Sequence, residues 1–232
     1  MRRRLFTILD EMFSGSPFSK DPLYRQNIIR QKMKRTLSLF ASKEAVFFKN
    51  RNFTPRAFEI DFGKKKPDEN QHGHLELDGK ILIRGAIDRL DVMPDGKRAL
   101  VVDYKLGERQ LRKEMDKGLG LQLPIYLLAA KRVFGLEPVG AELRFLQKDD
   151  EQGIYLESIR GDLGFSNRKR METKDNFDKI LQKAESDIVK IVSEIQEGNI
   201  SIRSKSCKYC AYNPVCRYEA WRLIYSEMEN GK

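Results

Sequence analysis

Two aspartates and a lysine stand at positions from which they could bind a divalent cation together. Asp88 and Asp103 are expected to lie directly opposite each other on the two strands of a β-hairpin. Opposed side chains have Cβ atoms about 4.5–5.5 Å apart, so the two carboxylates can share one cation. Lys105 follows Asp103 by two positions and therefore emerges on the same face. The alternative is an ion-pair cluster on a solvated face, in which Lys105 or Arg84 neutralises the acids.

The hairpin itself is predicted from two apolar, β-branched runs, residues 81–92 and 99–104. Between them stands Pro94-Asp95-Gly96-Lys97, and an Asp-Gly pair between such runs is a strong turn signal. A turn centred between Asp95 and Gly96 sets the register that brings residues 88 and 103 face to face.

Gln122 and Tyr126 are candidates for a supporting role. They are four residues apart in a predicted helix, residues 121–134, and so share one face of it. Polar side chains at that spacing on a mostly apolar helix can hydrogen-bond the acids of a metal site or a DNA backbone. The alternative is that Tyr126 belongs to the core and Gln122 caps the first turn.

Four further residues carry an expectation. Asp91 has an odd offset from Asp88, so we expect it on the other face of the strand in a structural pair with Arg89 or a neighbouring helix. Glu59, in a predicted strand over residues 53–62, could lie near the candidate site. The two histidines, His72 and His74, are more simply an exposed loop pair than metal ligands.

Three segments of the chain resemble the motifs of a nuclease family. The segments are Gly85-x-Ile87-Asp88-Arg89-x-Asp91, Val101-Val102-Asp103-Tyr104-Lys105-x-Gly107 and Gln122-x-x-x-Tyr126. In residue type, order and spacing they resemble the RecB-like branch of the PD-(D/E)xK nuclease superfamily. The likeness is greatest to the nuclease domain at the C-terminal end of AddB-type helicase-nuclease subunits, and it extends over most of the chain.

The resemblance implies a Mg²⁺- or Mn²⁺-dependent deoxyribonuclease, an exonuclease rather than an endonuclease, in a DNA repair and recombination system. It implies that Asp88, Asp103 and the backbone carbonyl of Tyr104 hold the metal. Lys105 would position the water or stabilise the oxyanion, and Gln122 and Tyr126 would orient the site. The sequence shows no G-x-x-x-x-G-K-[ST] phosphate loop, so unwinding would need a helicase partner or a helicase-like region N-terminal to this one.

The first predicted helix, residues 2–13, departs from the family pattern. In the family a helix like this one carries a further histidine ligand, in a pattern resembling H-x-h-L-[DE]. Aligned on Ile8-Leu9-Asp10, that place is Phe6, which cannot ligate a metal. Three explanations are open: the register is shifted by a residue or two, one ligand has been lost, or the sequence begins inside a longer protein.

A cysteine cluster stands near the end of the chain. Cys207-x2-Cys210-x5-Cys216 brings three soft thiolates together, which favours zinc or an iron–sulfur cluster over disulfides. In the family, cysteines at this spacing join a fourth, upstream cysteine to hold a [4Fe-4S] cluster, which would therefore be incomplete here. Zinc bound by three cysteines and a histidine is the alternative.

Composition favours a polyanionic partner. The formal net charge of +10 suits nucleic acid or an anionic membrane surface. No apolar run approaches the roughly 20 residues of a membrane span, and the N-terminus lacks a convincing signal peptide. These features lead us to expect a cytoplasmic protein.

The predicted order is helix, helix, strand meander, helix, strand pair and helix. We expect an α/β fold, a restriction-endonuclease-like mixed central sheet flanked by helices, with a nuclease domain over residues 1–199 and a cysteine-cluster segment over residues 200–232. Two other functions remain: a catalytically inactive DNA-binding scaffold derived from such a nuclease, and a zinc-stabilised nucleic-acid-binding domain without nuclease ancestry.

Overall fold

The computed structural model describes residues 2–63, 72–107, 120–147, 151–164 and 171–199, together with Tyr212 and Val215. The chain divides into two compact units, Met1–Ser186 and Asp187–Lys232, and the candidate residues from 88 to 126 all belong to the first. Cys207, Cys210 and Cys216 lie outside the described residues. The cysteine cluster and a domain boundary after residue 199 therefore stay predictions.

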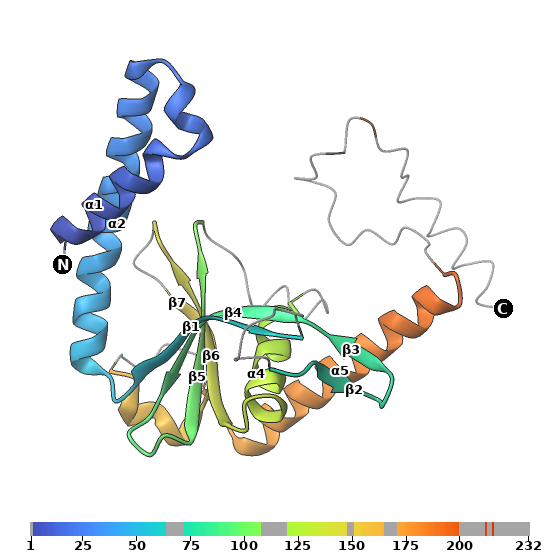
Figure 1. Ribbon diagram of the computed structural model, residues 1–232. Coiled ribbons are helices and arrows are strands. Elements are labelled where there is room, and N and C mark those ends of the chain that lie inside the picture. Colours follow the sequence, from blue (N-terminus) through green and yellow to red (C-terminus); the bar gives the residue numbers. More distant parts are fainter. Residues whose placement is uncertain are drawn as a thin grey trace. The chain divides into compact units, whose positions relative to one another are not determined.

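The order of elements follows the predicted one closely (Figure 1). The helices are α1 (Arg2–Ser14), the 3₁₀ helix η1 (Pro17–Lys20), α2 (Leu23–Asn50), α4 (Gln122–Arg132), the 3₁₀ helix η2 (Glu157–Asp162) and α5 (Lys174–Gln196). The strands are β1 (Thr54–Phe62), β2 (Leu75–Leu77), β3 (Ile81–Ile83), β4 (Gly85–Val92), β5 (Arg98–Lys105), β6 (Glu137–Phe145), β7 (Glu151–Leu156) and β8 (Met171–Glu172). None of the helices in these ranges is long and apolar enough to cross a membrane.

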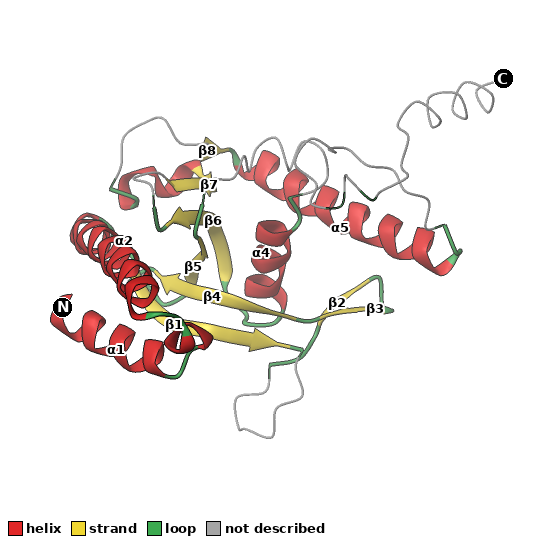
Figure 2. Ribbon diagram, turned by 90° about the horizontal axis from the view of Figure 1, so that it is seen from above, coloured by secondary structure: helices red, strands yellow, loops and turns green. Residues whose placement is uncertain are grey.

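The central sheet is mixed, as expected. Its order is β1-β4-β5-β6-β7-β8, with parallel pairing between β5 and β6 and between β7 and β8, and antiparallel pairing elsewhere. Figure 2 shows β4, β5 and β6 between α2 on one side and α4 on the other. The sheet with helices on its two faces is the α/β architecture that the sequence predicts.

The predicted consecutive meander is wrong at one point. The run of residues 81–92 is broken at Arg84, and β3 pairs with β2 in a separate two-stranded sheet, whereas β4 pairs with β1. The break has a steric reason at Gly85, which pairs with Phe62. A Cβ at Gly85 would lie 2.7 Å from Cζ of the Phe62 ring, so only glycine lets β1 and β4 approach there.

The register of the β4–β5 hairpin agrees with the prediction. Pairing runs from Val92 with Ala99 to Arg89 with Val102, and the Met93 N–H donates to the Arg98 carbonyl across the turn. Gly96 adopts φ +67°, which suits glycine. The Asp95 carboxylate accepts hydrogen bonds from the backbone N–H groups of residues 97 and 98, so the turn residues themselves hold the hairpin closed.

The start of α2 follows an Asp-Pro pair. The helix begins at Leu23, and Pro22 occupies the cap position without a side-chain cap hydrogen bond. The Asp21 carboxylate instead pairs with Arg25 at 3.3 Å. Asp21 thus interacts with the first turn of the helix through an ion pair four residues along the chain.

The core lies under α4. The central strand β5 is buried from Ala99 to Asp103. The helix α4 packs on β5 and β6, and its buried residues are Leu123, Pro124, Leu127, Leu128, Ala129 and Ala130. Each leucine buried in this way contributes about 1.5–3 kcal/mol to folding. This packing fixes the first turn of α4 against the C-terminal half of β5, where the candidate site lies.

Candidate active site

Asp103 stands at the centre of the candidate site. Its side chain is only 1% exposed. Lys105 Nζ lies 2.6 Å from Asp103 Oδ2, and Gln122 Nε2 donates a hydrogen bond to Oδ1 at 2.8 Å. Lys105 reaches the same carboxylate because side chains two positions apart on a strand leave on one face. Gln122 reaches it from the first residue of α4.

Asp88 joins the site through the backbone of β5. The Tyr104 N–H donates to Asp88 Oδ2 at 2.8 Å. Positions 88 and 103 are the next in the register that ends with Arg89 and Val102. The hairpin therefore brings the two aspartates to one place, as its predicted register requires.

Tyr126 closes one side of the cluster. Gln122 Nε2 donates to the Tyr126 hydroxyl at 3.1 Å, so one amide nitrogen links Tyr126 with Asp103. Burial raises the pKa of Tyr126, and the negative charges of Asp103, Asp88 and Glu59 act in the same direction. The hydroxyl therefore stays protonated at neutral pH and can donate a hydrogen bond.

The cluster carries an excess of negative charge. Asp88 and Asp103 bring two negative charges and Lys105 one positive charge, so these three side chains sum to one negative charge. Among the described residues, no three His, Cys, Asp or Glu side chains are grouped to hold a metal. Mg²⁺, however, usually takes only one or two carboxylates and completes its shell with water and phosphate oxygens. The donor set of two carboxylates and a nearby backbone fits Mg²⁺ or Mn²⁺.

The opposite face of the same strands carries a second, balanced set of charges. Arg89 is 1% exposed and donates to both oxygens of Asp91 at 2.6 and 2.5 Å, and to Glu44 of α2 at 2.7 Å. Glu44 also pairs with Arg144 at 2.7 Å. The predicted structural pairing of Asp91 with Arg89 is confirmed.

This buried set continues across the sheet. Arg51 at the end of α2 pairs with Glu142 at 3.0 Å, and Tyr155 donates to Glu142 at 2.9 Å. The guanidinium groups of Arg51 and Arg144 lie 3.2 and 3.3 Å from the centroid of the Phe47 ring. Three arginines and three acids thus face each other, and they hold α2 on the sheet.

Sequence reasoning missed this second set except for Asp91 and Arg89. Its members are far apart in the chain: 45 residues separate Glu44 from Arg89, and 91 separate Arg51 from Glu142. A partial signal was available in the pattern of α2, where Glu44 interrupts an apolar face that includes Ala41 and Phe47. A lone acid on the buried side of a helix requires a partner.

Glu59 lies opposite Asp88 on β1, between the paired positions Phe58 with Arg89 and Ile60 with Ile87. Its φ of +47° is in the left-handed region, which is unusual for glutamate. Its charge acts on Tyr126 together with those of the two aspartates. The structure therefore brings Glu59 to the border of the site.

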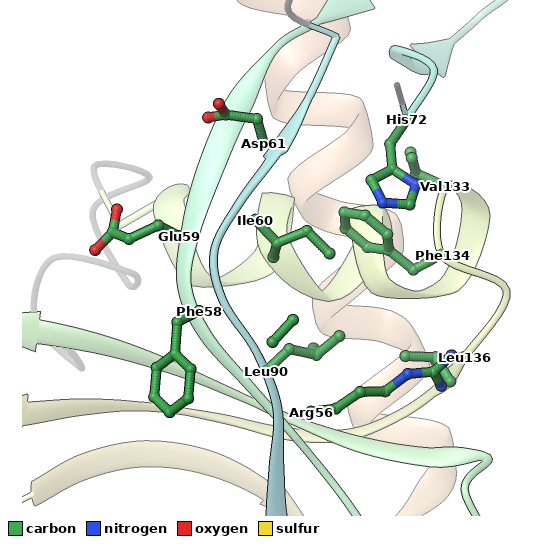
Figure 3. Close-up of a pocket in the computed structure, with 11 residues that line it drawn as sticks. Arg56, Phe58, Glu59, Ile60, Asp61, His72, Leu90, Val133, Phe134 and Leu136 are labelled. Atoms are coloured by element: carbon green, nitrogen blue, oxygen red, sulfur yellow. The ribbon is translucent and has the colours of Figure 1, made fainter. Parts of the chain in front are cut away.

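A pocket of about 670 Å³ follows the edge strand β1. Figure 3 shows Ile60 and Phe134 turned toward each other, with Glu59 and Asp61 turned away on the other side of the strand. The His72 ring packs edge-on against Phe134 at 4.6 Å. His72 is therefore half-buried, and the expectation of an exposed pair is correct only for His74.

Phe6 lies on α1, the helix that packs against α2. Lys34 Nζ of α2 is 5.5 Å from the centroid of the Phe6 ring, and Lys34 also pairs with Asp10 at 2.7 Å. The side chain that stands in place of the expected histidine is thus engaged with a lysine.

Comparison with known proteins places the chain in a family. The model of the PD-(D/E)XK nuclease superfamily matches residues 2–217, so the chain belongs to that superfamily. Members of this superfamily generally use Mg²⁺ or Mn²⁺, which agrees with the donor set of the two aspartates.

Among individual relatives, the chain is similar to the B-type subunit of the ATP-dependent helicase/deoxyribonuclease from Clostridium acetobutylicum. The two are 25% identical over 305 aligned positions, which cover 97% of this chain and 26% of the relative. The protein of the same name from Thermoanaerobacter sp. is 24% identical, covering 91% of this chain and 23% of its own length. The chain therefore spans about a quarter of the length of the curated relatives that it matches. The solved structure of SSO0001 aligns over 90% of this chain and 81% of its own length, with 18% identity and a TM-score of 0.32.

Proposed function

We propose that this chain is the nuclease part of a helicase-nuclease system and hydrolyses DNA phosphodiester bonds with Mg²⁺ or Mn²⁺. The observation that carries the proposal is the cluster on β4, β5 and α4. Its two aspartates and one lysine sum to one negative charge, and a divalent cation would reverse that sign. Membership of the nuclease superfamily and the names of the relatives support the same function.

Asp88, Asp103 and the backbone carbonyl of Tyr104 would hold the metal. A metal bound there would lower the pKa of a bound water and neutralise charge on the scissile phosphate. Gln122 occupies one oxygen of Asp103 and the Tyr104 N–H occupies one oxygen of Asp88. These hydrogen bonds fix the orientation of both carboxylates before any substrate arrives.

Lys105 would act directly on the substrate. Its side chain is 22% exposed and its ammonium is held by Asp103, so it reaches both the carboxylate and the solvent-facing side of the site. In that position it can orient the attacking water or stabilise the charge that develops on the phosphate oxygens. Tyr126, protonated and tied to Gln122, can donate a hydrogen bond to a DNA phosphate.

The remaining features are proposed from the resemblance. Cys207, Cys210 and Cys216 would supply three ligands of a [4Fe-4S] cluster. A helicase partner, or a helicase-like region of the same polypeptide, would unwind DNA and deliver it to the site. Consumption from an end, as an exonuclease, suits a nuclease that follows a helicase.

The test is cleavage of end-labelled linear DNA, single- and double-stranded, and of circular DNA, by anaerobically purified protein with Mg²⁺ or with EDTA. We compare the wild type with Asp103→Ala and Lys105→Ala. The matched controls are Asp178→Ala and Lys174→Ala, because these residues form an exposed aspartate–lysine pair on α5 at 3.0 Å.

Cleavage that needs Mg²⁺, disappears in both site variants and persists in both controls would support the proposal. An exonuclease would degrade linear DNA and leave circular DNA intact. Binding of DNA without cleavage, in wild-type protein shown to be folded, would contradict the nuclease proposal and favour the DNA-binding scaffold with Phe6 as the lost ligand.

A further inference from the structure

The hairpin carries an unusual link at the point where its two strands separate. Pairing of β4 with β5 runs as far as Arg89 and Val102. Two positions further along β5, the Tyr104 N–H donates to the Asp88 carboxylate at 2.8 Å. The Asp88 side chain of β4 thus accepts a hydrogen bond from the backbone of β5. This hydrogen bond orients the Asp88 carboxylate.

The Tyr104 side chain leaves on the other face of the sheet. Its hydroxyl accepts a hydrogen bond from Arg89 Nη1 at 2.6 Å. Its ring packs edge-on against Phe40 of α2, with the ring centroids 5.4 Å apart. Burial raises the pKa of Tyr104 to about 12, so the phenol is neutral at working pH.

The position of the Arg89 side chain is fixed by two acids. Asp91 holds its guanidinium through two hydrogen bonds and Glu44 through a third. Burial lowers the pKa of Arg89, but the hydrogen bond and charge of Asp91 outweigh it and raise the pKa above its ordinary value. The arginine is therefore always charged and bound to two elements, β4 and α2.

We propose that Tyr104 is a positioning residue whose hydroxyl, held by Arg89 on the α2 face, fixes the backbone N–H that orients Asp88 on the α4 face. One residue thereby connects the buried charges beneath the sheet with the acids above it. The inference deepens the proposed function and rests on it where metal binding is concerned. Its geometric part concerns the hydrogen bond between the Tyr104 N–H and Asp88 and needs no metal.

Tyr104→Phe tests the proposal because it removes only the hydroxyl and keeps the ring on Phe40. Tyr155→Phe is the matched control, since Tyr155 is another buried tyrosine whose hydroxyl bonds the same set of charges, at Glu142. Two measurements are made on each protein: amide hydrogen exchange at residue 104 by NMR, and binding of Mn²⁺ without DNA by calorimetry.

In Tyr104→Phe we expect the residue 104 amide to exchange about tenfold faster relative to residues 101 and 102, because its fixed hydrogen bond opens more often. We expect Mn²⁺ to bind about tenfold more weakly, the effect typical of losing a partner that orients a metal ligand. Tyr155→Phe should match the wild type in both measurements, even if it melts at a lower temperature.

Unchanged exchange at residue 104 in Tyr104→Phe would overturn the proposal, whatever the metal does. Faster exchange with unchanged Mn²⁺ affinity would overturn its metal-site part. Wild-type protein that binds no Mn²⁺ would contradict the proposed function instead, and the exchange measurement would still decide whether Tyr104 orients Asp88.

Discussion

The two faces of the β4–β5 hairpin are built from the same kinds of side chain and differ in their charge balance. On the α2 face, Arg51, Arg89 and Arg144 meet three acids, and the set is buried and neutral. On the α4 face, Asp88 and Asp103 meet Lys105, which is partly exposed, and these three sum to one negative charge. The charges of the six side chains in the first set cancel, whereas those of the three in the second set do not.

The difference shows what each face contributes. Buried acids that are fully paired with arginines hold elements together, and removal of one partner leaves an uncompensated charge. Acids that outnumber the cations beside them repel each other, and this cost is recovered only when a ligand binds. We therefore expect substitutions on the α2 face to lower stability and substitutions on the α4 face to lower activity.

The largest effect is expected for Asp103→Asn. Cleavage should fall about a thousandfold or more, because the site loses a proposed metal ligand and the partner of Lys105. The free energy of unfolding should fall by less than in variants of the α2 face, since relief of repulsion with Asp88 offsets part of the lost ion pair and Lys105 is partly exposed. Single-turnover cleavage and urea unfolding measure the two quantities. A loss of stability as large as that expected on the α2 face would contradict the comparison.

Arg89→Met should give the largest loss of stability. We expect the free energy of unfolding to fall by about 3–5 kcal/mol, because Asp91 and Glu44 remain buried without their arginine. The control is Arg98→Met, which breaks the exposed pair with Asp95 and should lower the free energy of unfolding far less. Equal urea midpoints for the two variants would show that the buried set does not stabilise the fold.

Glu142→Gln mirrors Asp103→Asn on the other face and should leave cleavage unchanged in folded protein. The free energy of unfolding should fall by about 1–3 kcal/mol, which is typical of losing one charged partner in a buried set of hydrogen bonds.

The same residue predicts a pH dependence. Burial alone would raise the pKa of Glu142, but Arg51, Arg144 and Tyr155 hold it below its usual value of 4.5. A lowered pKa in the folded state contributes stability that is present above pH 4.5 and is lost as the pH falls through the folded pKa. The difference in melting temperature between wild type and Glu142→Gln should therefore shrink below pH 4.5. A constant difference down to pH 3 would contradict this account.

The smallest effect belongs to the turn, which lies outside both faces. Backbone and side-chain hydrogen bonds from Arg98, and the Lys97 N–H, lower the pKa of Asp95 from 3.8 to about 2. Its contribution is therefore present above pH 3.8 and disappears toward pH 2. Asp95→Asn should melt slightly lower than the wild type at pH 5 and equally at pH 2, with cleavage at pH 7 unchanged. Thermal melts at the two pH values check this, and lost cleavage would show that the turn controls the site.

The candidate site residues could be predicted from the sequence because the contacts that join them are local. The Asp-Gly turn sets the register by its own hydrogen bonds, so residues 88 and 103 meet without help from distant elements. Lys105 follows from strand alternation and the shared face of Gln122 and Tyr126 from helix periodicity. Their contact with Asp103 depends on how α4 packs, which the family resemblance implied and periodicity could not show.

The failures lie where distant segments compete for the same strand. Residues 81–92 have the pattern of one strand, but they form two. β4 pairs with β1, where Phe62 closely approaches Gly85, and β3 pairs with β2. A strand pattern predicts which side chains share a face of the strand, but it does not predict which other strand will be the partner.

The sequence by itself determined the family, the hairpin register and the residues on one face of it, because turns, alternation and helix spacing act over a few residues. Only the tertiary structure decided the pairing of Glu44 with Arg89 and of Glu142 with Arg51, because these partners come from elements far apart in the chain. Buried charges need partners wherever packing brings them, and packing is settled by the whole core. The side of the sheet that carries the candidate site could thus be predicted from its motifs, whereas on the opposite side only the pairing of Asp91 with Arg89 could.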